Sequence, residues 1–131
     1  MDRIQSTKVV YHCVFHTYRR KPVLVEGIQK RANALIEEIA VDKGYHVTAR
    51  AVMPDHVHLL LQLPTGGVPR AMNMFKGIIS RRIFEQFPDL RMDMGSSHLW
   101  AAGYYARTVD ASSMVAAIRY IQNQGHPIHD L

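Results

Sequence analysis

Cysteine, long apolar runs and export signals are scarce or missing in this sequence. The chain of 131 residues has one cysteine, Cys13, so a disulfide within the chain is excluded. A lone cysteine suits a reducing compartment, and we expect a cytoplasmic protein. No apolar stretch approaches the ~20 residues of a membrane-spanning helix, and the N-terminus lacks the apolar region of a signal peptide. We therefore expect neither export nor membrane insertion.

Positively charged residues outnumber negatively charged ones only modestly. Sixteen Lys and Arg residues face eleven Asp and Glu residues, which gives a net charge of +5 with histidine neutral. This balance mildly favours a polyanionic partner such as nucleic acid, although many basic enzymes bind none. Apolar residues make up 47%, enough for one core, and the length fits a single domain over residues 1–131. Eight histidines are many for this length and raise the question of a metal site.

Hydrophobic periodicity predicts four strands and three helices. Apolar residues alternate with a period of two in some segments and recur every three to four residues in others. The order β-α-β-β-α-β-α is the ferredoxin-like pattern of an α/β (α+β) fold, with an antiparallel sheet and an added C-terminal helix. We expect two helices to cover one face of the sheet and the other face to stay open for a site or a partner. The predicted strands are residues 9–16, 45–53, 56–63 and 99–109, the last broken near Gly103; the predicted helices are residues 23–43, 69–87 and 112–124, and residues 89–98 are expected to form an irregular loop.

The segment His56-Val57-His58 is the first candidate for chemistry. Residues two apart in a strand point to the same face, so both imidazoles lie side by side while Val57 points toward the helices. Two neighbouring imidazoles suit a divalent metal ion. The alternative is a pair of solvated histidines at the start of an exposed strand face, and a bare His-x-His pattern does not exclude it.

Tyr120 and Gln124 are the second candidate, because residues four apart share one face of a helix. Taken alone, a tyrosine on a terminal helix usually packs, and a glutamine there is usually a surface residue. Together with two histidine ligands, Gln124 could supply a third ligand through its carbonyl oxygen. A phenol is a weak nucleophile near neutral pH, and a nearby cation would stabilise the phenolate. Attack of Tyr120 on a phosphate would then give a phosphotyrosine that keeps the bond energy for rejoining.

Two motifs occur together in this chain: Met-Pro-Asp-His-Val-His-Leu-Leu over residues 53–60 and Tyr-Ile-x-x-Gln over residues 120–124. This combination is specific, and the chain resembles the single-tyrosine HUH transposases, small insertion-sequence enzymes that act on single-stranded DNA. The resemblance spans nearly the whole chain. The matching stretches are residues 11–15, 18–21, 52–60, 75–77, 80–81, 99–100, 103–104 and 120–124.

The resemblance implies a role for each residue of the candidate site. His56 and His58 would be metal ligands, Gln124 would complete the site, and Tyr120 would be the nucleophile. The metal would be Mg²⁺ or Mn²⁺, and the substrate a single-stranded DNA hairpin at the end of an element. The family also implies a homodimer in which active sites are shared between chains. One departure is Asp110, where the family often has glycine; this residue is a good helix N-cap and could stiffen a hinge before the last helix.

Six basic residues are candidates for contact with DNA phosphates. Such clusters usually form a solvated charged face, and it is the resemblance that favours phosphate contact, which would position the strand without reading its sequence. The other histidines, His12 and His16 among them, are interpreted as ordinary structural residues. Trp100 and Tyr104 are expected in the core or a dimer contact and not as platforms for bases. The six candidates are Arg19, Arg20, Lys21, Lys76, Arg81 and Arg82.

Three alternative functions stay open on the sequence. A host-adopted relative of these transposases would share the chemistry and process repeated palindromes instead. A non-catalytic nucleic-acid binding module would tolerate loss of the four site residues, all of which are present here. A zinc hydrolase that uses the histidines alone would need a third strong ligand and a carboxylate base; Asp55 is adjacent to His56 but is expected in a turn.

Overall fold

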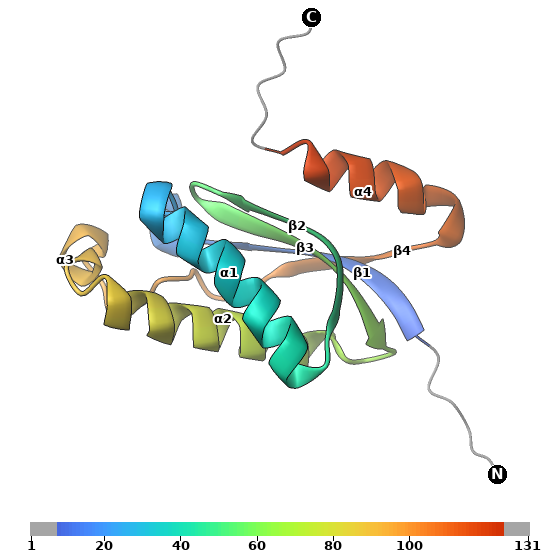
Figure 1. The fold of residues 1–131 in the computed structure, drawn as a ribbon, viewed down its shortest axis with the longest axis horizontal. Coiled ribbons are helices and arrows are strands. Elements are labelled where there is room, and N and C mark those ends of the chain that lie inside the picture. The colour runs from blue at the N-terminus through green and yellow to red at the C-terminus, as the bar shows by residue number, and fades with distance from the viewer. Residues whose placement is uncertain (1–7, 125–131) are drawn as a thin grey trace, which may run out of the picture.

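Four strands form one antiparallel sheet in the order β2-β3-β1-β4 (Figure 1). The computed structural model describes residues 8–124. β1 and β3 occupy the centre of the sheet, β2 and β4 its edges, and each neighbouring pair is antiparallel. This strand order and the element order confirm the predicted ferredoxin-like fold. The strands are β1 (Lys8–His16), β2 (His46–Met53), β3 (His56–Pro64) and β4 (Tyr105–Val109).

The two long helices lie on one face of the sheet and the last helix lies on the other (Figure 1). The helix α1 ends at Gly44, whose φ of 74° is the left-handed conformation that glycine adopts without strain. The helix α2 has a proline in its first turn, where the missing backbone N–H would have no helical partner. The helices are α1 (Glu26–Lys43), α2 (Val68–Gln86), α3 (Leu90–Met94) and α4 (Met114–Gln122), with 3₁₀ turns η1 (Tyr18–Arg20) and η2 (Ala111–Ser113).

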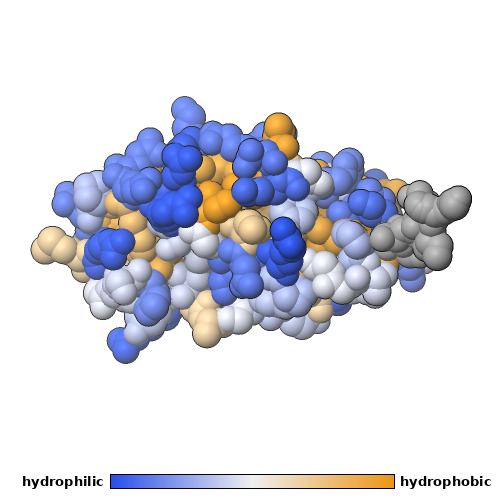
Figure 2. All heavy atoms as spheres, turned by 90° about the horizontal axis from the view of Figure 1, so that it is seen from below, coloured by the Kyte–Doolittle hydropathy of each residue, from blue (hydrophilic) through white to orange (hydrophobic). Residues whose placement is uncertain are grey.

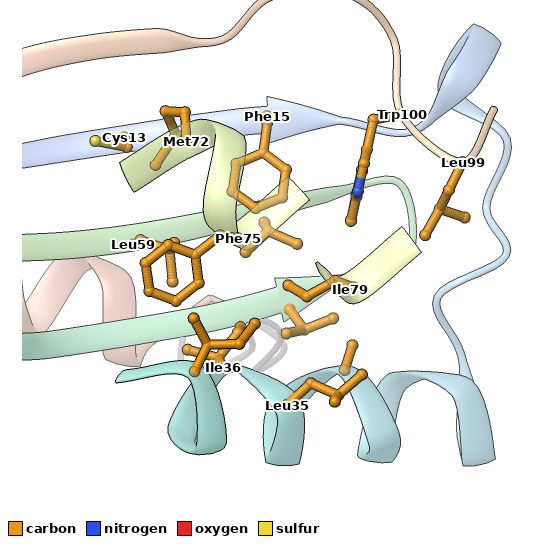
Figure 3. Close-up of a cluster of buried hydrophobic side chains, with 14 of the residues drawn as sticks. Cys13, Phe15, Leu35, Ile36, Leu59, Met72, Phe75, Ile79, Leu99 and Trp100 are labelled. Carbon is orange, nitrogen blue, oxygen red and sulfur yellow. The ribbon is translucent and has the colours of Figure 1, made fainter. Parts of the chain in front are cut away.

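The main core fills the space between the sheet and the helices α1 and α2 (Figure 3). Phe75 of α2 is fully buried there, and the rings of Phe15 and Trp100 meet edge to face with centroids 4.7 Å apart. The Trp100 indole N–H donates to the backbone oxygen of Lys76, so its only polar atom is satisfied. Cys13 of β1 is also fully buried, and burial raises the pKa of its thiol to about 12.

A second, smaller core lies under α4 on the opposite face of the sheet. It contains Leu60 and Ile121, both fully buried, with Ala49 and Val109 beside them. The sequence predicts that this face is open, and that expectation is wrong, since α4 covers part of it. Three consecutive residues of β3, Leu59 to Leu61, are therefore buried: the middle one faces α4, and the other two face α1 and α2.

The regions after α2 differ from their predicted forms. Residues 89–98 were expected to be irregular, but Leu90–Met94 form a helical turn because Leu90 and Met94 both bury their side chains, and Gly95 ends the turn with a φ of 65°. Only Tyr105–Val109 of the predicted strand 99–109 pairs as a strand. Trp100 makes a single bridge to Thr17, and Gly103 has a φ of 81°, which breaks the extended chain between them.

The surface on the side of α2 is mostly hydrophilic, with hydrophobic residues in small separate patches (Figure 2). None of the helices within residues 8–124 combines the length and the apolar character that crossing a membrane requires.

Phe75→Ala tests the main core. The ring is fully buried, so the substitution removes buried apolar atoms from the core and leaves a cavity in their place. We expect it to lower the free energy of unfolding by about 3–5 kcal/mol. Urea unfolding followed by circular dichroism measures this change. Met92→Ala is the control, because Met92 is 83% exposed and its loss should change the free energy of unfolding by less than about 0.5 kcal/mol. Equal effects of the two substitutions would contradict the assignment of the core.

Candidate active site

Four histidines gather on the sheet face that α4 partly covers, and they come from the two central strands. His12 and His16 lie on β1; His56 and His58 lie on β3. The antiparallel register sets His16 opposite His56 and Val14 opposite His58. Because side chains two residues apart share a face, the four imidazoles form one group. The predicted orientation of His56 and His58 away from α1 and α2 is confirmed, since Val57 between them belongs to the main core.

His56 and His58 direct one ring nitrogen each toward a common point. Their Nε2 atoms are 3.1 Å apart. Two donors that each lie about 2.1 Å from one octahedral ion, at right angles to each other, are roughly 3.0 Å apart. The two imidazoles therefore fit adjacent positions around a divalent metal ion. Within residues 8–124 no three His, Cys, Asp or Glu side chains form a metal-binding group, so further ligands would have to be other atoms.

The second ring nitrogen of His56 is fixed by a carboxylate. His56 Nδ1 lies 2.7 Å from Asp55 Oδ1, and Arg20 Nε donates to Asp55 Oδ2 at 3.1 Å. The hydrogen bond to His56 is the main cause that lowers the pKa of Asp55, and Arg20 adds to it. An ionised carboxylate only accepts hydrogen bonds, so Nδ1 of His56 carries the proton of this contact, and Nε2 is the nitrogen that faces His58. This is the arrangement that orients a metal-binding histidine.

The second ring nitrogen of His58 meets another histidine. His58 Nδ1 lies 2.9 Å from His12 Nε2, and both side chains are buried, His58 being 5% and His12 6% exposed. Burial lowers the pKa of His58 to about 4, and the neighbouring histidines add to this effect. Burial is likewise the first cause that lowers the pKa of His12, with Arg107 as the second. Both rings are therefore neutral near pH 7, and a neutral imidazole is the form that binds metal.

Tyr120 of α4 lies beside these histidines within the same chain. Its ring stands edge-on to His58 at a centroid distance of 5.9 Å and to His12 at 6.2 Å. The side chain is 55% exposed, so a substrate can approach it. The structure thus brings together three of the four residues of the predicted site: Tyr120, His56 and His58.

Gln124, the fourth predicted residue, is not brought to the histidines. Its Nε2 donates to the backbone oxygen of Tyr120 at 3.1 Å. Its side chain lines a different hollow, beside Gln29, Asn33 and Arg50. The amide thus satisfies one of the carbonyl groups that a helix leaves without a partner at its C-terminal end.

A hollow of about 460 Å³ lies next to Tyr120, between β4 and α4. His12 and Arg107 line one side of it, and Asp110 lines the end where α4 begins. Arg107 forms no ion pair with any other residue of the described chain, 8–124. The Asp110 side chain accepts a hydrogen bond from the backbone N–H of Ser113, which confirms its predicted role as an N-cap.

Three of the six predicted DNA contacts have partners within the chain. Besides the ion pair of Arg20 with Asp55, Lys21 Nζ donates to the backbone oxygen of Asp93. Lys76 Nζ donates to the backbone oxygens of Ala101 and Gly103 and holds the segment before β4. These cations have structural roles in the protein as it stands.

The other three predicted contacts are split between two places. Arg19 lies over the ring of Tyr18, at 5.3 Å from its centroid. Arg81 and Arg82 line a hollow between α1 and α2, on the opposite face of the sheet from the histidines. One cleavage site on the histidine face therefore does not contact all six residues at once.

Sequence reasoning missed His12, Asp55 and Arg107 as parts of this region. His12 and His16 are two periods of the alternation apart on one face of β1, but only the register of β1 with β3 shows that they meet His58 and His56. Arg107 is opposite His12 across the β1–β4 pair. The alternation of side chains would have indicated these contacts if the register had been known. His126 and His129 lie outside the described residues.

Comparison with known proteins places this geometry in a family. Residues 5–124 match the family described as IS200-like transposases. The chain is 32% identical to the ISDra2 transposase TnpA of Deinococcus radiodurans over 115 residues, which covers 87% of this chain and 82% of that protein. It is 28% identical to the transposase for insertion sequence element IS200 of Salmonella typhimurium over 116 residues, which covers 87% of this chain and 75% of that protein.

Solved structures show the same likeness. The fold is similar to a candidate transposase from Deinococcus radiodurans, with a TM-score of 0.75, 33% identity, and coverage of 95% of this chain and 96% of that one. It also resembles, in fold, a REP-associated tyrosine transposase bound to a REP hairpin, with a TM-score of 0.55, 19% identity, and coverage of 94% and 70%. The matched region includes Tyr120 and the four histidines that gather on the sheet face. The chain is a member of the IS200-like transposase family.

Proposed function

We propose that this transposase cleaves and rejoins single-stranded DNA with Tyr120 as its nucleophile. The observation that carries the proposal is the position of the Tyr120 ring, edge-on to His58, whose Nε2 converges with that of His56. A nucleophile and a pair of metal ligands are thus on one surface, and the hollow beside them is open to solvent on the same face. Family membership supports the reaction class.

The chemistry needs one exchange of bonds at phosphorus. The Tyr120 hydroxyl oxygen bonds to phosphorus, one phosphorus–oxygen ester bond of the DNA breaks, and the departing deoxyribose oxygen takes up a proton as the phenol loses one. The phosphotyrosine is again a diester, so attack by a DNA hydroxyl can reverse the step and rejoin a strand without an external energy source. Because Tyr120 is held by a helix and is half exposed, it can reach a strand that lies across the histidine face.

His56 and His58 would hold the divalent ion, Mg²⁺ or Mn²⁺, through Nε2. The bound ion would polarise the scissile phosphate and stabilise charge on the attacking oxygen. Gln124 could join the site only after its amide leaves the Tyr120 carbonyl and the side chain turns toward the histidines. We therefore assign Gln124 a weaker and conditional part in metal binding.

We propose a single-stranded hairpin as the substrate. The REP-associated relative of similar fold is bound to a REP hairpin, and the family acts in transposition. On this chain the strand would run along the hollow beside Tyr120, where the guanidinium of Arg107 can meet a phosphate. Arg81 and Arg82 line the hollow between α1 and α2, so they could contact only a part of the hairpin that wraps to the opposite face.

We also propose a homodimer in which α4 of one chain can complete the site of the other. Two features support this proposal. Ile121 is the one fully buried side chain of α4, and Val115 and Tyr120 are 66% and 55% exposed. The other apolar residues that α4 packs on its own sheet are only partly buried: Met114, Ala117 and Ile118. The edge strand β4 carries the exposed Tyr105 and offers unpaired backbone groups to a second copy.

Tyr120→Phe should abolish cleavage of a labelled single-stranded hairpin and the covalent protein–DNA adduct. The change removes one hydroxyl from a half-exposed ring, so folding and hairpin binding should stay close to those of the unchanged protein. Denaturing gel electrophoresis detects the adduct, and a blunt duplex of the same sequence is the control substrate, which should not be cut. A persistent adduct in the Phe variant would overturn the assignment of the nucleophile.

His58→Ala should weaken Mn²⁺ binding and DNA cleavage together, by about tenfold or more, because it removes one of two imidazole ligands. Gln124→Ala should have a smaller effect, since the amide is bonded to the helix backbone and water can replace a neutral oxygen ligand. Titration of Mn²⁺ into each variant, followed by electron paramagnetic resonance of the free ion, measures the affinity. Unchanged affinity in the His58 variant would refute the metal site.

A mixture of His58→Ala and Tyr120→Phe proteins tests the sharing of sites. After subunit exchange in equal amounts, half of the dimers are mixed, and with shared sites one of the two sites in each is intact. Cleavage should then return to about a quarter of the activity of the unchanged protein. If each site is built within one chain, as in the single-chain structure, every site keeps a defect and the mixture stays inactive. Sedimentation as a monomer at active concentrations would also exclude the dimer.

A further inference from the structure

A chain of hydrogen-bonded contacts runs through the candidate site from Asp55 to His12. The contacts are Asp55 Oδ1 to His56 Nδ1 at 2.7 Å, His56 Nε2 to His58 Nε2 at 3.1 Å, and His58 Nδ1 to His12 Nε2 at 2.9 Å. A hydrogen bond at any of these contacts needs one donor and one acceptor, so the position of a proton in one contact restricts the next. The first contact is fixed, because the Asp55 carboxylate accepts from Arg20 Nε through Oδ2 and from His56 Nδ1 through Oδ1.

With one proton on each imidazole, two arrangements of protons are then possible. In the closed arrangement, His58 donates from Nε2 to His56, and its Nδ1 accepts from His12. In the open arrangement, His58 carries its proton on Nδ1 and donates to His12, so the Nε2 lone pairs of His56 and His58 converge. Only the open arrangement leaves both ligand nitrogens free of protons, and the closed one blocks the metal position.

His12 is the group that makes the open arrangement possible. His58 is only 5% exposed, so water cannot readily accept the proton on Nδ1, and a buried donor without a partner is unfavourable. His12 supplies the acceptor from the neighbouring strand, where it is paired with Leu60 on one side and Arg107 on the other. If the acceptor were absent, His58 would adopt the closed arrangement, in which its proton lies on Nε2 and is donated to His56.

His16 provides an internal comparison. It occupies the same face of β1, and its ring lies 5.6 Å from that of His56. The outer nitrogen of His56 already has Asp55 as its partner, and His16 makes no hydrogen bond to His56 within the described chain. The two β1 histidines are therefore equivalent in sequence pattern but different in contact, since only His12 bonds to a ligand ring.

We propose that His12 is a positioning residue which accepts the Nδ1 proton of His58 and thereby sets the tautomer in which His58 can bind metal. The inference rests on the proposed metal-binding role of His56 and His58. It gives His12 no contact with the metal ion, because its Nε2 is used in the bond to His58. It also gives a role to a polar ring that is buried in the central strand.

The test compares three variants by titration with Mn²⁺. His12→Phe keeps a ring of similar size but has no acceptor, and it should bind Mn²⁺ about 10-fold to 100-fold more weakly. His12→Gln places an amide oxygen near the position of Nε2 and should restore affinity to within about threefold of the unchanged protein. His16→Phe, the matched control on the same strand face, should bind as the unchanged protein does.

A second measurement needs no variant. Imidazole nitrogen shifts in ¹⁵N NMR spectra of the unchanged protein distinguish the two tautomers, and with Mg²⁺ bound we expect His58 protonated on Nδ1 and His12 unprotonated on Nε2. The inference is overturned if His12→Phe is folded and binds Mn²⁺ as tightly as the unchanged protein, or if His58 carries its proton on Nε2 in the Mg²⁺ form. Loss of Mn²⁺ binding in His58→Ala combined with unchanged binding in His12→Phe would refute this inference alone. If the variants change Mn²⁺ affinity as expected but the unchanged protein does not cleave DNA, only the proposed function is refuted.

Discussion

The antiparallel pairing of β1 with β3 is the constraint on which the rest of the structure depends. It runs along the centre of the sheet from Lys8 opposite Pro64 to His16 opposite His56. On one face it presents Phe15, Val57 and Leu59 to the two long helices, and so forms the main core. On the other face the same register gathers four histidines from two strands. Fold and site are therefore two sides of a single set of backbone hydrogen bonds.

Much of the fold could be predicted because it follows from periodicity along the chain. The alternation in β3 assigned His56 and His58 to one face, and the helical spacing assigned Tyr120 and Gln124 to one side of the last helix. The contacts that the sequence did not predict depend on the register of the strands, or on which of two possible partners a side chain bonds to. His12 meets His58 only through a diagonal across two strands, and Gln124 bonds to its own helix instead of the histidines. Neither outcome is encoded in a local pattern.

The amphipathic spacing of α4 did not predict which face of the sheet the helix covers. Leu60 is buried by α4, so three consecutive buried residues in β3 indicate apolar cover on both faces of the sheet. A continuous apolar run such as Leu59 to Leu61 is typical of a strand that is buried on both faces, and the predicted open face did not take this into account. The cover is partial, and it leaves a polar hollow beside Tyr120 that His12 and Arg107 also line.

The burial of Cys13 has a practical consequence for spectroscopy. Its thiol is fully enclosed in the core, and a raised pKa keeps it in the unreactive protonated form. Thiol-specific dyes and spin labels should therefore leave the native chain unmodified. A cysteine introduced on the exposed side of α4 would be the one reactive thiol within residues 8–124, without replacement of the natural one. Site-directed labelling can then test the proposed exchange of α4 between two chains in an otherwise unaltered protein.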